Sequence, residues 1–286
     1  MTEADPAPQP DPAGTALDDA LAEARRRGRE DLVARLAAAR ARMQESTCTV
    51  LVVGEFNKGK SSLINALLNA RVCITDGDIA TAVPTSVRYG AALSAVVRSD
   101  AGEGRPVALD DVEAVVTQRT PGPAVRTVEV TVPRELLREG LVLVDTPGVG
   151  GGLSAAHATN TLRALAGADT VVFVTDASQE LTAAELAFLQ RAAVLCPRLL
   201  VAVAKIDFYP EWRRIVDLDR RHLHGAGLEP QVVPLSAPLR HHGLRTGDLA
   251  LTAESGYPVL AAALRRMLRT TGRTHAVAAA ASRTAR

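Results

Sequence analysis

Two glycines five residues apart, followed directly by a lysine and a serine, constrain this chain more than any other feature. The segment Gly54-Glu55-Phe56-Asn57-Lys58-Gly59-Lys60-Ser61 follows a β-branched run, Thr49–Val53, and leads into an alanine- and leucine-rich run, Ser61–Ala70. Glycine allows the chain to turn sharply, so this order predicts a strand, a tight loop and a helix in succession. The pattern therefore favours an α/β fold with this loop at the end of a strand.

The same loop has the residues of a phosphate-binding site. Backbone N–H groups turned inward bind phosphate oxygens, and the helix that follows directs its positive end at them. We expect Lys60 to reach the β- and γ-phosphates and Ser61 to ligate Mg²⁺. A chance match to the motif is the alternative, and the setting between a strand and a helix argues against it. The predicted nucleotide-binding residues of this segment are Gly54, Asn57, Lys58, Gly59, Lys60, Ser61 and Ser62.

A second motif, Asp145-Thr146-Pro147-Gly148, follows the apolar run Leu141–Val144. An aspartate at a strand end can hold a magnesium-bound water, and the Gly148 N–H can contact the γ-phosphate. Alone, these four residues would indicate only a turn. Between the two signals lies Thr81-Ala82-Val83-Pro84-Thr85, in which we expect Thr81 to bind magnesium, with Thr85 as the competing candidate. The predicted metal ligands are Ser61, Thr81 and, through water, Asp145; the predicted catalytic residues are Lys60, Thr81 and Gly148.

Asp207 is the residue that predicts which base is bound. Guanine carries an N1–H and a 2-amino group that adenine lacks, and one carboxylate accepts from both. In Ala204-Lys205-Ile206-Asp207, after the strand-like run Leu199–Val203, the Lys205 stem would cover the ring while Asp207 reads its edge. Ala204 stands where an Asn or Thr would help to tie this loop to the phosphate loop. Ser236-Ala237 follows another strand and offers a backbone N–H to guanine O6, so the order of motifs favours GTP over ATP.

Apolar runs and amphipathic segments alternate along most of the chain. This alternation predicts a mainly parallel sheet with helices on both faces, preceded by an amphipathic helix at Ala16–Met43. The segment from Ser86 to Val132 lacks clear helices except Leu109–Thr117, so we expect antiparallel strands to extend the sheet there. Further predicted strands are Ser86–Tyr89, Leu93–Arg98, Thr127–Val132, Leu141–Val144, Thr170–Val174, Leu199–Ala204 and Gln231–Pro234, and further predicted helices are Ala156–Ala166, Ala183–Ala193, Trp212–Gly225 and Tyr257–Leu268.

Composition excludes several classes of function. The 33 basic and 32 acidic residues leave a net charge of +1, and only 3% of residues are aromatic, which argues against nucleic acid as a partner. Three cysteines match neither a zinc site nor a disulfide framework, which is typical of reduced thiols in a cytosolic protein. No apolar run reaches the roughly 18 residues that a transmembrane helix needs, and the first residues lack a signal-peptide pattern. The histidines His222, His224, His241 and His242 lie in polar segments and are expected to be solvated rather than metal-bound.

Taken together, the four motifs from about Thr49 to Leu268 resemble the bacterial dynamin-like GTPases. The resemblance implies a P-loop GTPase domain at 47–270, a disordered tail at 1–15, a neck-like helix at 16–46 and the start of a second neck helix or a tail at 271–286. It also implies Mg²⁺-dependent hydrolysis of GTP to GDP and phosphate, with pairing of two copies across the nucleotide face. Membrane remodelling, with a membrane or a second dynamin-like protein as partner, would involve regions outside this chain. The implied location is the cytoplasm, or the inner face of the cell membrane.

Two residues of the loop depart from that family pattern. Phe56 occupies the position where animal dynamins carry a glutamine that positions the attacking water, and Asn57 occupies the position of a common serine. Water would then be oriented by the backbone around Thr81 and Gly148. One alternative function is a nucleotide-dependent binding or assembly module with little hydrolysis. Another is an assembly factor for ribosomes or tRNA, which the balanced charge disfavours.

Overall fold

The computed structural model describes residues 12–33, 36–37, 47–73, 75, 83–99, 104–112, 114, 125–147, 165, 167–196 and 198–283. The chain divides into two compact units, Thr49–Arg265 and the terminal segments Met1–Cys48 with Arg266–Arg286. The larger unit contains every sequence motif identified above, so the site is a property of this unit.

A nine-stranded sheet runs through the described part of the chain in the order β4-β3-β5-β2-β6-β1-β7-β8-β9. The strands β1, β7, β8 and β9 are parallel neighbours, and β2 is parallel to β5. Antiparallel pairs join β2 to β6, β3 to β4 and β3 to β5. This mainly parallel sheet with an antiparallel extension confirms the predicted fold class. The strands are β1 (Cys48–Val53), β2 (Thr85–Tyr89), β3 (Ser94–Ser99), β4 (Gly104–Val107), β5 (Val125–Val132), β6 (Leu141–Asp145), β7 (Thr170–Asp176), β8 (Leu199–Ala204) and β9 (Gln231–Pro234).

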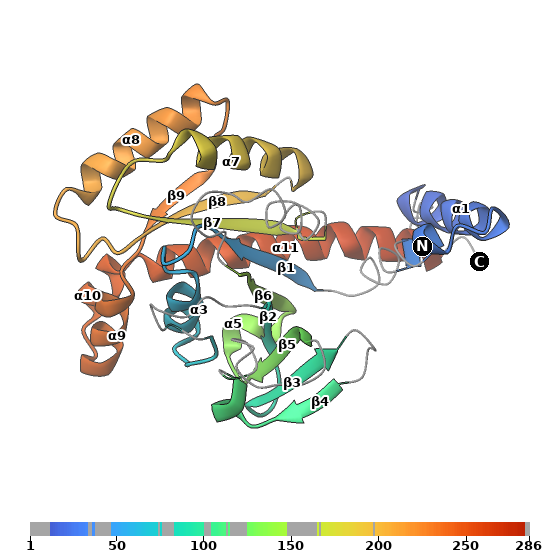
Figure 1. Cartoon of the computed structure of the whole chain (residues 1–286), viewed down its shortest axis with the longest axis horizontal. Helices are drawn as coiled ribbons and strands as arrows, with labels where there is room; N and C mark the ends of the chain where they lie inside the picture. Colours follow the sequence, from blue (N-terminus) through green and yellow to red (C-terminus); the bar gives the residue numbers. More distant parts are fainter. Residues whose placement is uncertain are drawn as a thin grey trace, which may run out of the picture. The chain divides into compact units, whose positions relative to one another are not determined.

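Helices cover both faces of the parallel part of the sheet, as Figure 1 shows for α7 and α8 on one side and α3 on the other. Of the predicted segment Leu109–Thr117, the described part forms a 3-10 turn at Leu109–Asp111 and is α-helical at Val112 and Ala114. The predicted helix Ala156–Ala166 lies almost wholly outside the described residues. The helices are α1 (Pro12–Arg26), α3 (Lys60–Leu68), α5 (Glu135–Arg138), α7 (Ala183–Leu195), α8 (Trp212–Gly225), α9 (Ala237–Thr246), α10 (Leu249–Glu254) and α11 (Tyr257–Arg283).

The burial of β1 explains why this strand reads as a continuous apolar run. Leu51 and Val53 belong to a buried cluster with Phe188 of α7 and Val216 of α8. Val50 and Val52 are equally buried but lie outside that cluster. Successive side chains of a strand point to opposite faces, so β1 is covered on both sides. An apolar strand of this kind fixes the position of the loop that follows it.

The antiparallel extension is buried on one face only. Val128, Val130 and Val132 of β5 are buried, whereas the residues between them are partly exposed. Among these, Glu129 accepts hydrogen bonds from Arg98 at 2.6 Å and from Arg88 at 3.2 Å. The sequence did not predict β4, because its Gly104-Arg105-Pro106-Val107 composition is poor in strand formers. Pairing of this edge strand with β3 overrides that local preference.

The N-terminal helix differs from the predicted Ala16–Met43 segment. Helix α1 begins at Pro12, within the segment predicted as a tail, and ends at Arg26. Gly28 follows with φ of +65°, a left-handed conformation that ends a helix at little cost in glycine. Residues 30–33 are helical again. A single glycine therefore breaks the apolar periodicity into two helical pieces.

Candidate nucleotide-binding site

The predicted phosphate loop connects β1 to α3, and left-handed backbone recurs along it. Gly54, Asn57 and Gly59 have φ values of +150°, +59° and +99°. At Gly54 an added Cβ would lie 2.1 Å from the carbonyl oxygen of Val174 in β7, so only glycine fits there. Positive-φ residues at intervals in a turn allow backbone N–H groups to face one side. The loop therefore has the backbone shape of an anion-binding site.

Lys60, the first residue of α3, is buried with 7% of its surface exposed. Its Nζ donates to the carbonyl oxygens of Gly54, at 3.0 Å, and Glu55, at 2.8 Å. Burial lowers the pKa of this ammonium, and the charges of Asp145 and Glu55 oppose that shift. Because neutral carbonyls do not balance a buried charge, the lysine is a ready partner for an anionic phosphate.

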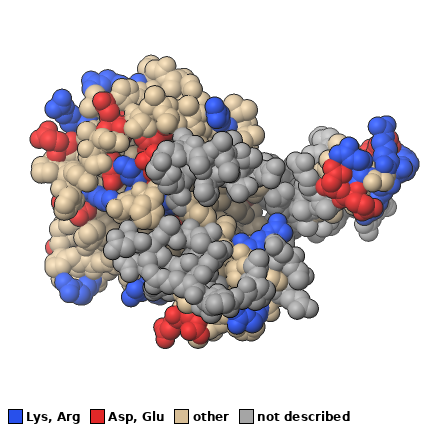
Figure 2. Space-filling model, viewed as in Figure 1, with Lys and Arg blue, Asp and Glu red and all other residues tan. Residues whose placement is uncertain are grey.

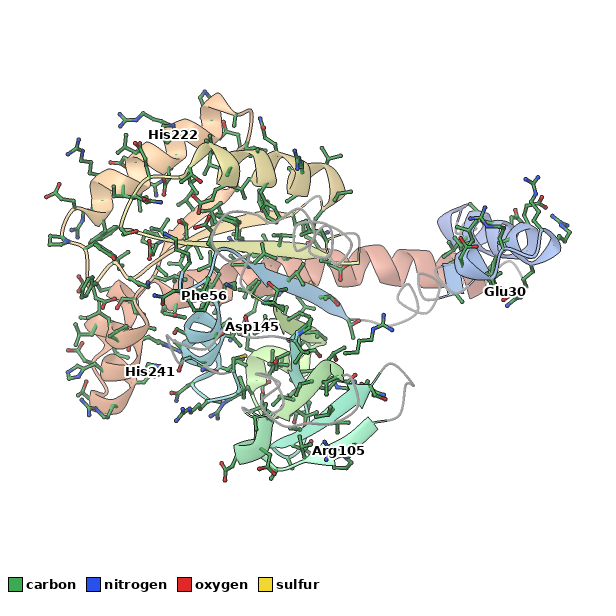
Figure 3. All side chains as sticks on the ribbon, in the orientation of Figure 1. Glu30, Phe56, Arg105, Asp145, His222 and His241 are labelled. Carbon is green, nitrogen blue, oxygen red and sulfur yellow. The ribbon has the colours of Figure 1, made fainter. Side chains whose placement is uncertain are left out.

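Asp145 ends β6 beside this loop and is 1% exposed. The Ser61 hydroxyl donates to its Oδ2 at 2.6 Å, while its buried Oδ1 has no hydrogen-bond partner within the described residues. Burial raises the pKa of Asp145 to about 6, against the hydrogen bond from Ser61 and the charge of Lys60. A carboxylate oxygen without a partner, next to a serine hydroxyl, fits a hydrated Mg²⁺ ion. Figure 3 labels Asp145 at the end of β6 and Phe56 in the phosphate loop.

The predicted base-reading residues surround a cavity of about 260 Å³. Lys205 has φ of +60°, and its Nζ donates to the backbone oxygen of Asn57 at 2.6 Å. Asp207 is exposed at the cavity, and Tyr257, the first residue of α11, is 2% exposed. Burial raises the pKa of the Tyr257 hydroxyl. The cavity is lined by Gly59, Ser62, Leu63, Ala204, Lys205, Asp207, Phe208, Leu235, Ala237, Pro238 and Tyr257.

Ser236 and Ala237 have different environments at the start of α9. The Ser236 N–H donates to the Ser255 carbonyl at 3.0 Å, and its hydroxyl accepts from the Leu239 N–H at 3.1 Å. Ser236 therefore caps the helix with both groups engaged. Ala237 lines the cavity, which makes its N–H the better candidate to meet guanine O6.

The structure reveals one polar residue that the sequence reasoning missed. Asp176, at the end of β7, accepts a hydrogen bond from Lys58 Nζ on Oδ1 at 2.9 Å and from Lys205 Nζ on Oδ2 at 3.0 Å. Ser178 Oγ also donates to Oδ1, at 2.5 Å. Burial alone would raise the pKa of Asp176, but the hydrogen bonds from Ser178, Lys58 and Lys205 lower it to about 2. The signal was available, because Asp176 follows an apolar strand much as Asp145 does.

The described residues thus bring most of the predicted site to one edge of the sheet. The backbone of the loop, Lys60, Ser61 and Asp145 lie at the phosphate end, and Lys205 and Asp207 lie at the base end. The side chain of Lys58 binds Asp176 instead of pointing to a phosphate. Thr81 and Gly148 lie outside the described residues. Thr85, the alternative to Thr81, is the buried first residue of β2 and is 2% exposed.

Within the described residues, the paired histidines, the cysteines and the charged surface give no second candidate site. His222 pairs with Glu180 at 2.7 Å and His224 with Glu229 at 2.6 Å, and within the described residues no three His, Cys, Asp or Glu side chains gather in a way that could hold a metal ion. The three cysteines are buried thiols. On the face in Figure 2, acidic and basic side chains of the described residues are interspersed. Among the helices searched, which cover the described residues, none combines the length and apolar character needed to span a bilayer.

Comparison with known proteins shows the family to which the chain belongs. Residues 50–198 match the dynamin family. Isoniazid-induced protein IniA from Mycobacterium tuberculosis is 39% identical over 251 residues, which cover 85% of this chain and 39% of the relative. Bacterial dynamin-like protein from Nostoc punctiforme is 28% identical over 163 residues, covering 52% of this chain and 23% of that protein.

The fold has a solved counterpart in an oligomerised bacterial dynamin pair, described as providing a mechanism for the long-range sensing and tethering of membranes. The TM-score is 0.66 at 16% identity, over 86% of this chain and 38% of the solved chain. At this identity the match establishes the fold. The chain spans about two fifths of the length of its IniA relative and of this solved chain.

Proposed function

Because the chain belongs to the dynamin family, we propose that it is a Mg²⁺-dependent GTPase that hydrolyses GTP to GDP and phosphate. The observation that carries this proposal is the placement of the phosphate loop, a buried carboxylate and the Lys205–Asp207 loop at one edge of the sheet. Nucleotides bind at this edge in open α/β sheets, because the carboxyl ends of the parallel strands and the helix N-termini meet there.

The phosphate end of the site has a role for each residue. Lys60 exchanges its two carbonyl partners for β- and γ-phosphate oxygens, and the loop N–H groups bind the remaining oxygens. Ser61 would ligate Mg²⁺, and Asp145 would hold the hydrated ion through the carboxylate oxygen that has no described partner. When bound, the ion would supply positive charge beside the phosphates. Thr81 and Gly148, assigned from sequence alone, would complete the metal and γ-phosphate contacts.

The base end reads guanine through its hydrogen-bonding edge. Asp207 accepts from the N1–H and the 2-amino group, and the Lys205 stem covers one face of the ring while its ammonium holds the Asn57 carbonyl. Ala237 donates its N–H to O6. This arrangement selects against adenine, which presents no donor to the Asp207 carboxylate at the same two positions.

Phe56 affects how the attacking water can be positioned, because this position of the phosphate loop carries an apolar side chain instead of a polar one. It is 38% exposed and cannot orient a water by hydrogen bonding. In-line attack would instead rely on water held by the backbone around Thr81 and Gly148. We infer that a second copy docks across the nucleotide face and completes this water-positioning site. The solved structure with the same fold is described as an oligomerised bacterial dynamin pair, which supports this self-association.

The proposed setting follows from the family. Residues 47–270 act as the GTPase domain, and 16–46 with 271–286 contribute to a neck. The protein acts in the cytoplasm, or at the inner face of the cell membrane, and its membrane partner or second dynamin-like partner binds through segments outside this chain. Nucleic acid is not a partner.

Replacement of Asp207 by asparagine tests the base assignment. The amide of the new side chain keeps one acceptor for N1–H but presents an NH₂ to the 2-amino group, so GTP affinity should fall about 10- to 100-fold. Xanthosine triphosphate carries an oxygen at that position and should bind the variant better than it binds the parent chain. Equilibrium titration with both nucleotides measures this exchange. A variant that keeps its GTP affinity would refute the role of Asp207.

A second candidate function is a nucleotide-dependent assembly module with little hydrolysis, which the exposed Phe56 favours. Titration of GTP binding, run beside phosphate release over a range of protein concentrations, separates the two. The GTPase proposal predicts a specific rate that rises with protein concentration as copies pair. Tight binding with phosphate release no faster than in buffer would support the assembly module instead.

A further inference from the structure

We propose that Asp176 is a positioning residue that locks the base-reading loop to the phosphate loop and thereby sets guanine selectivity. This inference rests on the proposed function, since it concerns how the same site holds the base. Asp176 contacts neither predicted phosphate nor base positions directly. It acts through two lysines, Lys58 of the phosphate loop and Lys205 of the base-reading loop.

The contacts form a continuous bridge between the two loops. One carboxylate oxygen of Asp176 accepts from Lys58 Nζ at 2.9 Å, and the other accepts from Lys205 Nζ at 3.0 Å. Lys205 Nζ also donates to the Asn57 carbonyl at 2.6 Å. The phosphate loop is therefore held twice, through a side chain and through its backbone. The backbone contact ends directly at the Lys205 ammonium, whose stem is proposed to cover the base, and the Lys58 contact reaches that ammonium through Asp176.

The side chains of the bridge are largely buried, which strengthens the electrostatic interactions between them. The Asp176 side chain is 6% exposed, that of Lys58 12% and that of Lys205 33%. Removing one carboxylate would leave two ammonium groups side by side without their shared partner. In a partly buried site the two would repel each other, so Lys205 would leave its place beside the cavity.

Residue 204 explains why such a bridge is needed. Ala204 is 8% exposed, and its Cβ lies against the phosphate loop, 3.4 Å from where a Cβ on Gly59 would stand. A methyl group at this contact packs but makes no hydrogen bond. An amide side chain at the same position would reach the loop backbone directly. Asp176 supplies the polar link that Ala204 does not.

The test compares GDP with inosine diphosphate, which lacks the 2-amino group that Asp207 is proposed to read. Equilibrium binding of both is measured for the parent chain and for Asp176→Asn. The variant should bind GDP about 10-fold more weakly, because charged hydrogen bonds are lost. The preference for GDP over inosine diphosphate should also fall. A smaller fraction of folded protein would lower the apparent affinities for GDP and inosine diphosphate by the same factor. A change in their ratio therefore reports a change in how the base is positioned.

Matched variants sharpen the result. Asp169→Asn changes an aspartate at the other end of β7, which accepts from the Thr49 N–H at 2.7 Å, and should leave the preference unchanged. Adding Ala204→Asn to Asp176→Asn supplies a direct link from the neighbouring position and should restore at least half of the lost preference. Lys58→Met removes the other end of the bridge and should lower the preference even if Asp176→Asn fails to fold.

The outcomes separate the two proposals. If the parent chain binds no guanine nucleotide, the proposed function and the bridge are both overturned. If the parent binds GDP and Asp176→Asn retains its affinity and preference, the bridge alone is overturned. Circular dichroism shows whether Asp176→Asn is folded. If it is unfolded, a preference for GDP in Lys58→Met equal to that of the parent overturns the bridge, and a reduced preference supports it.

Discussion

Gly54→Ala is predicted to destabilise the larger unit strongly even without nucleotide. The added Cβ would lie 2.1 Å from the Val174 oxygen and 3.1 Å from its carbonyl carbon. Carbon–oxygen contacts of this kind are normally about 3.3 Å or longer, so the two atoms would overlap by about 1.2 Å. Both colliding groups belong to the loop and strand backbone, and no side chain can rotate to relieve the contact.

The position of β7 prevents easy relief of this overlap. The strand pairs with β1 through Val53↔Phe173 and with β8 through Val174↔Ala202, so it is held on both sides. Overpacking costs about 1–3 kcal/mol, and a strained backbone at a φ of +150° costs about 1–3 kcal/mol more. The expected loss in the free energy of unfolding is about 2–6 kcal/mol. That is a large share of the roughly 5–15 kcal/mol of a typical domain.

Urea unfolding of the nucleotide-free protein, followed by circular dichroism, measures this loss. Gly227→Ala is the matched control, since Gly227 also has a left-handed φ, +74°, but nothing lies within 4 Å of its added Cβ. The control should lose only about 1 kcal/mol of backbone strain. Equal losses in the two variants, at unchanged denaturant slope, would refute the steric reasoning.

Three further changes test the larger unit. Asn65→Ala removes a buried amide that accepts from the N–H groups of Val72 and Cys73 and donates to the Cys73 carbonyl; unfolding by urea should show a loss of about 3 kcal/mol, and a loss below about 1 kcal/mol would contradict it. Burial raises the pKa of Asp219 to about 6, above its ordinary 3.8, so its contribution to stability is full below about pH 4 and is lost as pH rises through about 6. Urea unfolding from pH 4 to 7 should therefore show Asp219→Asn gaining on the parent by up to roughly 3 kcal/mol, and parallel pH profiles would refute this. Thr182→Ala removes the capping box of α7 and should cost about 1 kcal/mol in the same assay, with Thr182→Ser as the control that keeps the cap.

The sequence alone determined the parts of the site that depend on local chain geometry. Strands β8 and β9 have the bounds that their apolar runs predicted, and helix α8 has the bounds predicted from its amphipathic pattern. The loop Gly54–Ser61 was predictable because the phosphate-binding motif places its glycines, lysine and serine at a fixed spacing along the chain. Such requirements are written in consecutive residues, so a single sequence reveals them.

Tertiary structure decided everything that depends on residues distant along the chain. Lys58 is predicted to bind the nucleotide, and its side chain pairs with Asp176, 118 residues away, because β1 and β7 end side by side. Tyr257 reaches the base cavity only because α11 begins beside it. Local patterns fix backbone shape, whereas strand order fixes which side chains meet. The phosphate loop could therefore be predicted from the sequence, whereas the bridge that joins it to the base-reading loop could not.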